Sequence, residues 1–310
     1  MKKKFDTQKL LAPLALVILY IFFSITGRNF FGIDGLKQIL QSCYYIGYMA
    51  FGVTFVIITG GIDLSLGSNM LCSALLGGVA YKLWGWPLIP ALILVLVVGV
   101  FFGFCNGVMI AKLKLPPFIA TLGTMKIFRS VTQQLTKQFN PEVPDSFKLL
   151  TSAKIGGQVI LPIIYWVAVV VLMHIIFKKT AFGRQTIAVG SNERAAKLSG
   201  INVSRVKRRI YALGGVMCAI AAVIYVARIG SMDFANAGNG YEMDAIAAVI
   251  VGGTAMSGGK GSLVGAFLGM LIIGVMNNIL NTVGVPTFLC DAVKGAIIIF
   301  AVLLQKKDNA

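Results

Sequence analysis

Apolar stretches separated by short polar segments run through almost the whole chain. Their lengths are close to the ~20 residues that an α-helix needs to cross the hydrocarbon core of a membrane. Ten-residue strands of alternating polarity, which build membrane barrels, are absent. The pattern predicts about ten membrane-spanning helices. The expected spans are Leu10–Ile25, Tyr44–Thr59, Leu66–Leu83, Pro87–Ala111, Phe118–Leu135, Val159–Phe177, Ile210–Val226, Tyr241–Met256, Leu263–Leu280 and Phe288–Leu304.

Composition supports the same class of protein. Of the 310 residues, 57% are hydrophobic and 13% are charged, and the mean hydropathy is +0.84. A soluble domain has about 25% charged residues, so this mixture could not cover the surface of a water-soluble globule. We therefore expect an all-α polytopic membrane protein in which residues 1–310 form a single transmembrane domain.

The charge pattern adds an orientation. The net charge of +17 could indicate nucleic-acid binding, but no basic stripe alternates with exposed aromatic residues, and we expect no nucleic-acid partner. In a membrane protein, an excess of lysine and arginine marks cytoplasmic segments. The basic runs AKLKLP, KKTAFGRQ, RVKRR and QKKDNA all fall inside if ten spans start from a cytoplasmic N-terminus. Both termini are then expected in the cytoplasm, and the largest outer loop carries Glu142 and Asp145.

The first residues resemble a secretory signal, because Lys2, Lys3, Lys4 and Lys9 precede an apolar stretch. A clear A-x-A cleavage site is missing. We therefore expect Leu10–Ile25 to be retained as the first span, with the lysines in the cytoplasm.

No set of residues suited to catalysis is visible. His174 is the only histidine, and the five cysteines are scattered singly without metal or disulfide spacing. The glycine-rich stretch Gly252–Ser262 is not a phosphate loop, because with Lys260 as the loop lysine the first glycine position is Thr254 and the hydroxyl position is Gly261. We expect no metal, no cofactor and no ATP hydrolysis by this chain, and a tight inner turn at this stretch.

The polar segment Lys178–Arg209 carries the signals of an ordered helix. Asn192 is suited to cap it, and Gly200 is suited to end it. Glu193 in the first turn and Lys197 in the last turn both favour the helix dipole. A plain connector needs no such helix, so we favour a short helix that docks on a cytoplasmic partner.

Polar residues also recur inside the expected spans. They are Asn69, Asn106, Thr121, Lys126, Arg129, Asn277, Asn278, Asn281, Asp291 and Lys294. Such side chains are costly in lipid and face other helices or water. Hydrogen bonding between helices explains any single one of them, whereas together they indicate a polar interior path. Our candidate path residues are Asp63, Ser65, Asn69, Asn106, Thr121, Asn277 and Asn278.

Asp63 stands in the stretch TGGIDLSLGS, at the turn between two expected spans. It can cap the following helix through its N-terminal amides. Alternatively, it lines the inner mouth of the path or supports the contact with a partner.

Five motifs in order resemble the permease subunits of bacterial sugar ABC importers of the ribose, xylose, arabinose and galactose type, closest to the ribose-like branch. The motifs are GVTFVIITGGIDLSLGS, NGVMIAKLKLPPFIATLGTM, FGRQTIAVGSNERAAKLSGINV, GYEMDAIAAVIVGGTAMSGGKGSLVGAFLG and VKGAIIIFAVLLQKK. The resemblance implies the fold of the vitamin B12 importer's permease and a place in the bacterial inner membrane. It also implies a cytoplasmic ABC ATPase, a periplasmic sugar-binding protein and a second permease, either an identical copy or a sister chain.

Ser191–Gly200 resembles the family's coupling region, which docks on the ATPase. It departs from the strict E-A-A-x-x-x-G form, because Arg194 follows Glu193. We expect Ala196 to lie in a close contact with the ATPase. The coupling residues carried over are Asn192, Glu193, Arg194, Ala195, Ala196, Ser199 and Gly200.

Two internal echoes give different registers. Gly103–Phe118 resembles Gly274–Phe288, which would be an inverted repeat, whereas Ile57–Ser65 resembles Val249–Ser257, which would be a parallel repeat. The two cannot both define one register, so the sequence leaves open whether the chain contains an internal repeat.

Two other classes of function compete with an importer subunit. A stand-alone secondary transporter or channel would need paired intramembrane charges, yet Lys126, Arg129 and Lys294 have no obvious acidic partner in the sequence apart from Asp291. A membrane enzyme has no catalytic constellation to support it. The ordered inner segment favours a chain that works with a partner.

Overall fold

The computed structural model describes residues 33–136, 139–153, 159 and 161–282, together with a few isolated positions after residue 285. In that part of the chain the regular structure is helical, apart from one isolated bridge between Glu142 and Ser231. The expected span Leu10–Ile25 lies outside the described residues, and only isolated positions of Phe288–Leu304 fall within them.

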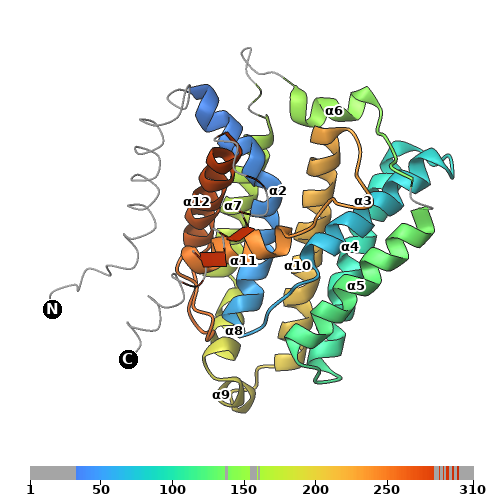
Figure 1. Ribbon diagram of the computed structural model, residues 1–310. Coiled ribbons are helices and arrows are strands. Elements are labelled where there is room, and N and C mark those ends of the chain that lie inside the picture. Colours follow the sequence, from blue (N-terminus) through green and yellow to red (C-terminus); the bar gives the residue numbers. More distant parts are fainter. Residues whose placement is uncertain are drawn as a thin grey trace.

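The described helices form one bundle, with α5 at one side and α12 towards the other (Figure 1). They are α2 (Ile33–Ile58), α3 (Leu66–Lys82), α4 (Leu88–Ala111), α5 (Pro117–Thr136), α6 (Asp145–Ser152), α7 (Leu161–Lys179), α8 (Ala181–Ser191), α9 (Glu193–Leu198), α10 (Val203–Ile229), α11 (Tyr241–Val251) and α12 (Leu263–Thr282).

Eight of these helices fall on eight of the expected spans: α2, α3, α4, α5, α7, α10, α11 and α12. Within the described residues, only α4, α7 and α10 are both long and apolar enough, by composition, to cross a membrane unaided. The expected span Tyr241–Met256 was too long, because α11 ends at Val251 and a glycine-rich turn follows it. The all-helical class is confirmed, and the count of ten spans stays a prediction.

Close backbone contact between α4 and α10 organises the bundle. Gly99, Gly103 and Gly107 recur every four residues along one face of α4, and Gly215 lies opposite them on α10. A Cβ atom at Gly103 would overlap the carbonyl of Tyr211, and one at Gly215 would overlap the carbonyl of Gly99. Small residues at this spacing let two membrane helices approach backbone to backbone. These glycines therefore fix where α10 crosses α4.

The second half of the bundle packs around α2. Trp166 of α7 is fully buried, with its ring 6.3 Å from that of Phe51 on α2 and 4.8 Å from that of Phe267 on α12. Gly47 provides the room for this indole, because a Cβ atom there would lie 2.5 Å from Nε1. Thus α2 stands between α10 on one side and α7 with α12 on the other (Figure 1).

The helix α11 is half as long as a span. Its 11 residues rise about 16 Å, roughly half of the ~30 Å hydrocarbon core. It starts after Gly240, whose φ is 77°, and it lies at mid-height in the bundle (Figure 1). The chain therefore reaches α11 through non-helical backbone, residues 231–240, which runs inward from the end of α10.

Candidate functional site

The short helix α9 forms as its end signals indicate. The side chain of Asn192 accepts a hydrogen bond from the Ala195 amide at 2.9 Å, which is an N-cap contact. Gly200 has a φ of 82° and donates to the carbonyl of Lys197. Ile201 N–H donates to the carbonyl of Ala196, so the chain closes on the helix end in the left-handed turn that glycine allows. The predicted cap and the predicted end are both confirmed.

The exposure of the α9 residues differs from the expectation that Ala196 lies at the surface, in contact with an ATPase. Ala196 is only 4% exposed and packs within its own chain, whereas Leu198 is 90% exposed. The other residues between Ser191 and Gly200 are exposed as well. A substitution at Ala196 therefore acts first on the internal packing of this chain. Leu198 is the large apolar side chain that α9 leaves exposed.

One further contact joins α9 to α10, and a cap fixes the start of α10. Lys207, in the first turns of α10, donates to Glu193 Oε2 at 2.7 Å. The side chain of Asn202 caps α10 by accepting from the Arg205 amide at 2.9 Å. An exposed ion pair of this kind contributes less than about 1 kcal/mol, so it orients α9 more than it stabilises it. At the other side, α8 leads directly into α9 through Asn192.

Three segments meet at a glycine junction beside the end of α8. They are Gly190 with Ser191, the last turn of α2 at Ile58, and the loop Gly258–Gly259. Gly259 N–H donates to the carbonyl of Ile58 at 2.8 Å. A Cβ atom on Gly190 would overlap that same carbonyl. The segment that carries α9 is therefore in direct backbone contact with the end of a bundle helix.

The turn after α2 carries several of the predicted path residues, and they are buried. Asp63 Oδ1 accepts from the Ser65 amide at 2.9 Å and from the Ser65 hydroxyl at 2.7 Å. Asn106 of α4 donates through Nδ2 to Ser65 Oγ at 2.7 Å, and its Oδ1 has no protein partner. Asp63, Ser65 and Asn106 are each at most 2% exposed. They tie the start of α3 to α4.

Asp63 does not cap the first turn of α3 as expected, because within the described residues it bonds only Ser65, which is itself the N-cap residue, and α3 has no side-chain cap hydrogen bond. A carboxylate at this end is favoured by the helix dipole. The carbonyl of the preceding residue, Ile62, accepts from Thr121 Oγ1 and from Tyr211 OH, both at 3.4 Å. The turn is thereby held from α5 and α10 as well.

The remaining predicted path residues lie in other places. Asn69 Nδ2 donates to the carbonyl of Gly99 at 3.2 Å, between α3 and α4. Asn277 of α12 donates to Asp244 Oδ2 of α11 at 3.2 Å. Asn277 and Asn278 are half-buried. The predicted set is thus split between the α3–α4 contact and the α11–α12 contact, and its role in a path stays a prediction.

A set of polar residues that the site prediction omitted lies on the open face of α5. Lys126, Ser130 and Gln134 are exposed at four-residue spacing, so with Gly123 they form one stripe of the helix, beside exposed apolar residues such as Ile127 and Val131. Arg129 is half-buried beside them. The spacing of these residues can be seen in the sequence. That they form an exposed stripe is recognised only once the buried face of α5 is known.

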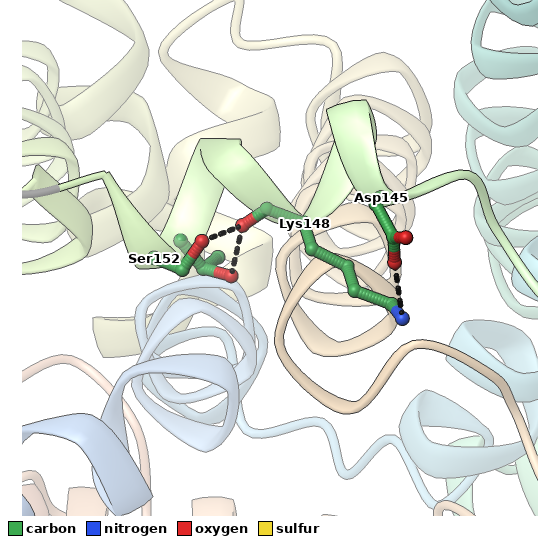
Figure 2. A network of polar contacts seen from close by, with 4 residues as sticks. Asp145, Lys148 and Ser152 are labelled. Atoms are coloured by element: carbon green, nitrogen blue, oxygen red, sulfur yellow. Dashed lines mark hydrogen bonds and ion pairs between the residues drawn. The ribbon is translucent and has the colours of Figure 1, made fainter.

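The end of the bundle opposite α9 carries α6 (Figure 1). Lys148 Nζ bonds Asp145 Oδ1 at 2.8 Å, and Ser152 Oγ donates to the Lys148 carbonyl at 2.9 Å (Figure 2). The hydrogen bond and charge of Lys148 lower the pKa of Asp145, and Asp145 in turn raises the pKa of Lys148. Both groups are therefore charged at neutral pH, on a helix that is open to a partner on that side.

Comparison with known proteins relates the chain to membrane permeases of transport systems. Residues 35–302 match the family described as the permease component of branched-chain amino acid transport systems. The chain is 43% identical to the ribose import permease protein RbsC of Bacillus subtilis, over 98% of this chain and 94% of that protein. It is 39% identical to RbsC of Escherichia coli K12 over 96% of this chain and 93% of that protein.

More distant similarity extends to permeases named for other sugars. The chain is 32% identical to the xylose transport system permease protein XylH of Haemophilus influenzae, over 99% of this chain and 98% of that protein. No solved structure matches the chain significantly.

Proposed function

Because the chain belongs to the family of transport-system permease components that its residues 35–302 match, we propose that it is the transmembrane permease subunit of an ABC importer for a monosaccharide. The observation that carries the proposal is the near full-length similarity to ribose import permeases, at 43% and 39% identity. This similarity favours a ribose-like pentose as the substrate, and a hexose is the alternative.

The chain's features support separate subunits for sugar passage and for ATP hydrolysis. The chain has no phosphate loop in its sequence, so ATP hydrolysis belongs to a separate cytoplasmic ATPase. The end-capped helix α9, with Leu198 exposed, is the surface that would dock on that ATPase. The glycine junction would pass its movement to α2 and to the turn at Asp63.

A sugar-binding protein would dock on the opposite face, at α6. The path itself would be completed by a second permease, because in one copy the polar face of α5 is open. A polar helix face is not stable against lipid. We therefore propose a dimer of permeases in the bacterial inner membrane, with the coupling segment, residues 178–209, on the cytoplasmic side.

Reconstitution tests this function directly. The permease is placed in liposomes with its ATPase, and the sugar-binding protein is added on the outer side. We expect uptake of radiolabelled ribose that requires ATP and the binding protein, and no ATP hydrolysis by the permease alone. Sugar uptake by the permease alone, driven by an ion gradient, would instead establish a stand-alone transporter.

A further inference from the structure

The non-helical segment between α10 and α11 runs deep into the bundle beside α5. Arg129 lies in the second half of the 20-residue helix α5. Its guanidinium donates to the carbonyls of Ala235 and Ala237, both at 3.2 Å. The segment 231–240 therefore passes the body of a membrane helix with backbone that forms no helix of its own.

Such backbone is stable at membrane depth only where it is buried in protein or lines a water-filled cavity. One side of the segment is buried. Ala237 and Gly238 are buried, and a Cβ atom at Gly238 would overlap the carbonyl of Gly67 at the start of α3. On the other side, Asn236, Asn239 and Gly240 are exposed. The exposed side is the one that would line an aqueous space.

Arg129 ties this segment to α5, which has exposed polar residues of its own. We define the polar wall as the exposed polar residues of these two joined elements: Lys126, Ser130, Gln134, Asn236 and Asn239. The wall contains the carboxamides of Asn236 and Asn239 on non-helical backbone, and a hydroxyl, a carboxamide and an ammonium group on α5. A carboxamide both donates and accepts hydrogen bonds, which matches a ligand whose hydroxyls do the same.

Charges of both signs lie near the two asparagines, Lys126 and Arg129 on α5 and two acids on α11, so neither an anion nor a cation is favoured. The half-length helix α11 begins here, and its first turn contains Glu242 and Asp244, at most 8% exposed. Their carboxylates oppose an anion at this helix end, where a helix without them would attract one. The carboxylate of Asp233 is occupied within the segment, since it accepts from the Ala235 amide and from Asn236 Nδ2, both at 2.9 Å. That bond also holds the Asn236 side chain in place.

We propose that Asn236 and Asn239 form a contact site for a neutral, polyhydroxylated monosaccharide inside the translocation path, with Arg129 as the residue that positions the segment. The inference rests on the proposed function and adds to it the place where the permease itself meets the sugar. The carboxamides hydrogen-bond individual hydroxyls, so the permease takes part in selecting the sugar after the binding protein has released it.

A series of deoxy sugars tests the proposal. Ribose and its analogues, each lacking one hydroxyl, are transported by the reconstituted importer with one binding protein and either the unaltered permease or Asn239→Ala. The ratio of the analogue rate to the ribose rate is compared between the two permeases, so the contribution of the binding protein cancels. For at least one analogue we expect this ratio to rise about three- to tenfold in Asn239→Ala, the worth of one hydrogen bond.

Asn236→Ala gives a second, independent measurement, and Met243→Leu is the matched control, since Met243 is exposed beside the site but has no strong hydrogen-bonding group. Unchanged ratios for both asparagine variants, in an importer that transports ribose, would overturn the contact site alone. If the two variants instead lose the permease dimer in light scattering, the wall is a subunit interface and the site is likewise overturned. Absence of any sugar uptake by the unaltered importer would count against the proposed function.

Discussion

At the scale of single residues, α9 shows how exposure decides the part that a side chain can play. Ala196 and Leu198 are two positions apart on a six-residue helix, yet one is 4% and the other 90% exposed. When a partner covers a large exposed apolar side chain, the free energy of the complex falls by about 25 cal/mol per Å² of apolar surface buried. Leu198 is therefore the residue of α9 that most favours docking.

Replacing Leu198 with serine should weaken the complex with the ATPase without affecting the fold. An exposed site tolerates substitution within about 0.5 kcal/mol, so the melting temperature of the permease should not change. Recovery of the ATPase with the tagged permease should fall several-fold. Leu113→Ser is the control, because Leu113 is 66% exposed in another loop; equal recovery in both variants would show that α9 does not dock through Leu198.

Replacing Ala196 with arginine should act on the permease itself. The added side chain has no room in a packed site, and overpacking costs about 1–3 kcal/mol. We expect a lower melting temperature of the permease in detergent, even with no ATPase present. An unchanged melting temperature, with loss of ATPase recovery alone, would place Ala196 at the subunit contact after all.

At the scale of the elements, backbone contacts at glycine set the arrangement of the helices. The contacts between α4 and α10, and those at the end of α8, leave no room for even one carbon atom. Dispersion forces between closely packed backbones replace the hydrophobic effect, which does not drive association in lipid. Small changes at these positions should therefore have large and specific effects.

Gly103→Val should disrupt the contact of α4 with α10. The new side chain would overlap the carbonyl of Tyr211, so the helices must separate or the chain must misfold. We expect little monodisperse protein in size-exclusion chromatography after extraction. Gly123→Val is the control, since a Cβ atom there has no neighbour within 4 Å, and comparable yields of the two variants would contradict this account of the helix crossing.

Gly190→Ala should reduce sugar uptake without reducing binding of the ATPase. The methyl group would overlap the Ile58 carbonyl and push the end of α8 away from α2, while α9 keeps its exposed face. We expect normal ATPase recovery with sugar uptake reduced at least several-fold. Normal uptake in this variant would mean that the glycine junction plays no part in coupling.

At the scale of the whole molecule, α6 and α9 occupy opposite ends of the bundle (Figure 1). The positive-inside rule predicts that the basic segment around α9 faces the cytoplasm. The same orientation puts α6, with its ion pair of Asp145 and Lys148, on the outer face. Two partners can then bind at once without competing for the same surface.

Cysteine labelling in intact cells tests this orientation. The side chain of Asp145 is 94% exposed, so Asp145→Cys should react with a membrane-impermeant thiol reagent. Leu198→Cys should react only after the cells are opened. The unaltered chain serves as the control for the native cysteines, and labelling of Leu198→Cys in intact cells would invert the topology.

The sequence by itself determined the features that depend on neighbouring residues. Long apolar stretches predict membrane helices because each one satisfies its own backbone hydrogen bonds in lipid. Asn192 and Gly200 predict the ends of α9 because capping acts within one helical turn. The membrane class, most helix positions and the short helix α9 therefore follow from local patterns of residues alone.

Only the tertiary structure decided which sides of these elements meet. Ala196 is buried within the chain, and α11 is only half as long as a span. The segment before α11 runs deep into the bundle beside Arg129. The signals for that descent, asparagines and glycines between two apolar stretches, predict a turn but not its depth. Depth and facing arise from contacts between residues far apart in the chain, such as Gly67 with Gly238, and local sequence patterns do not contain these contacts.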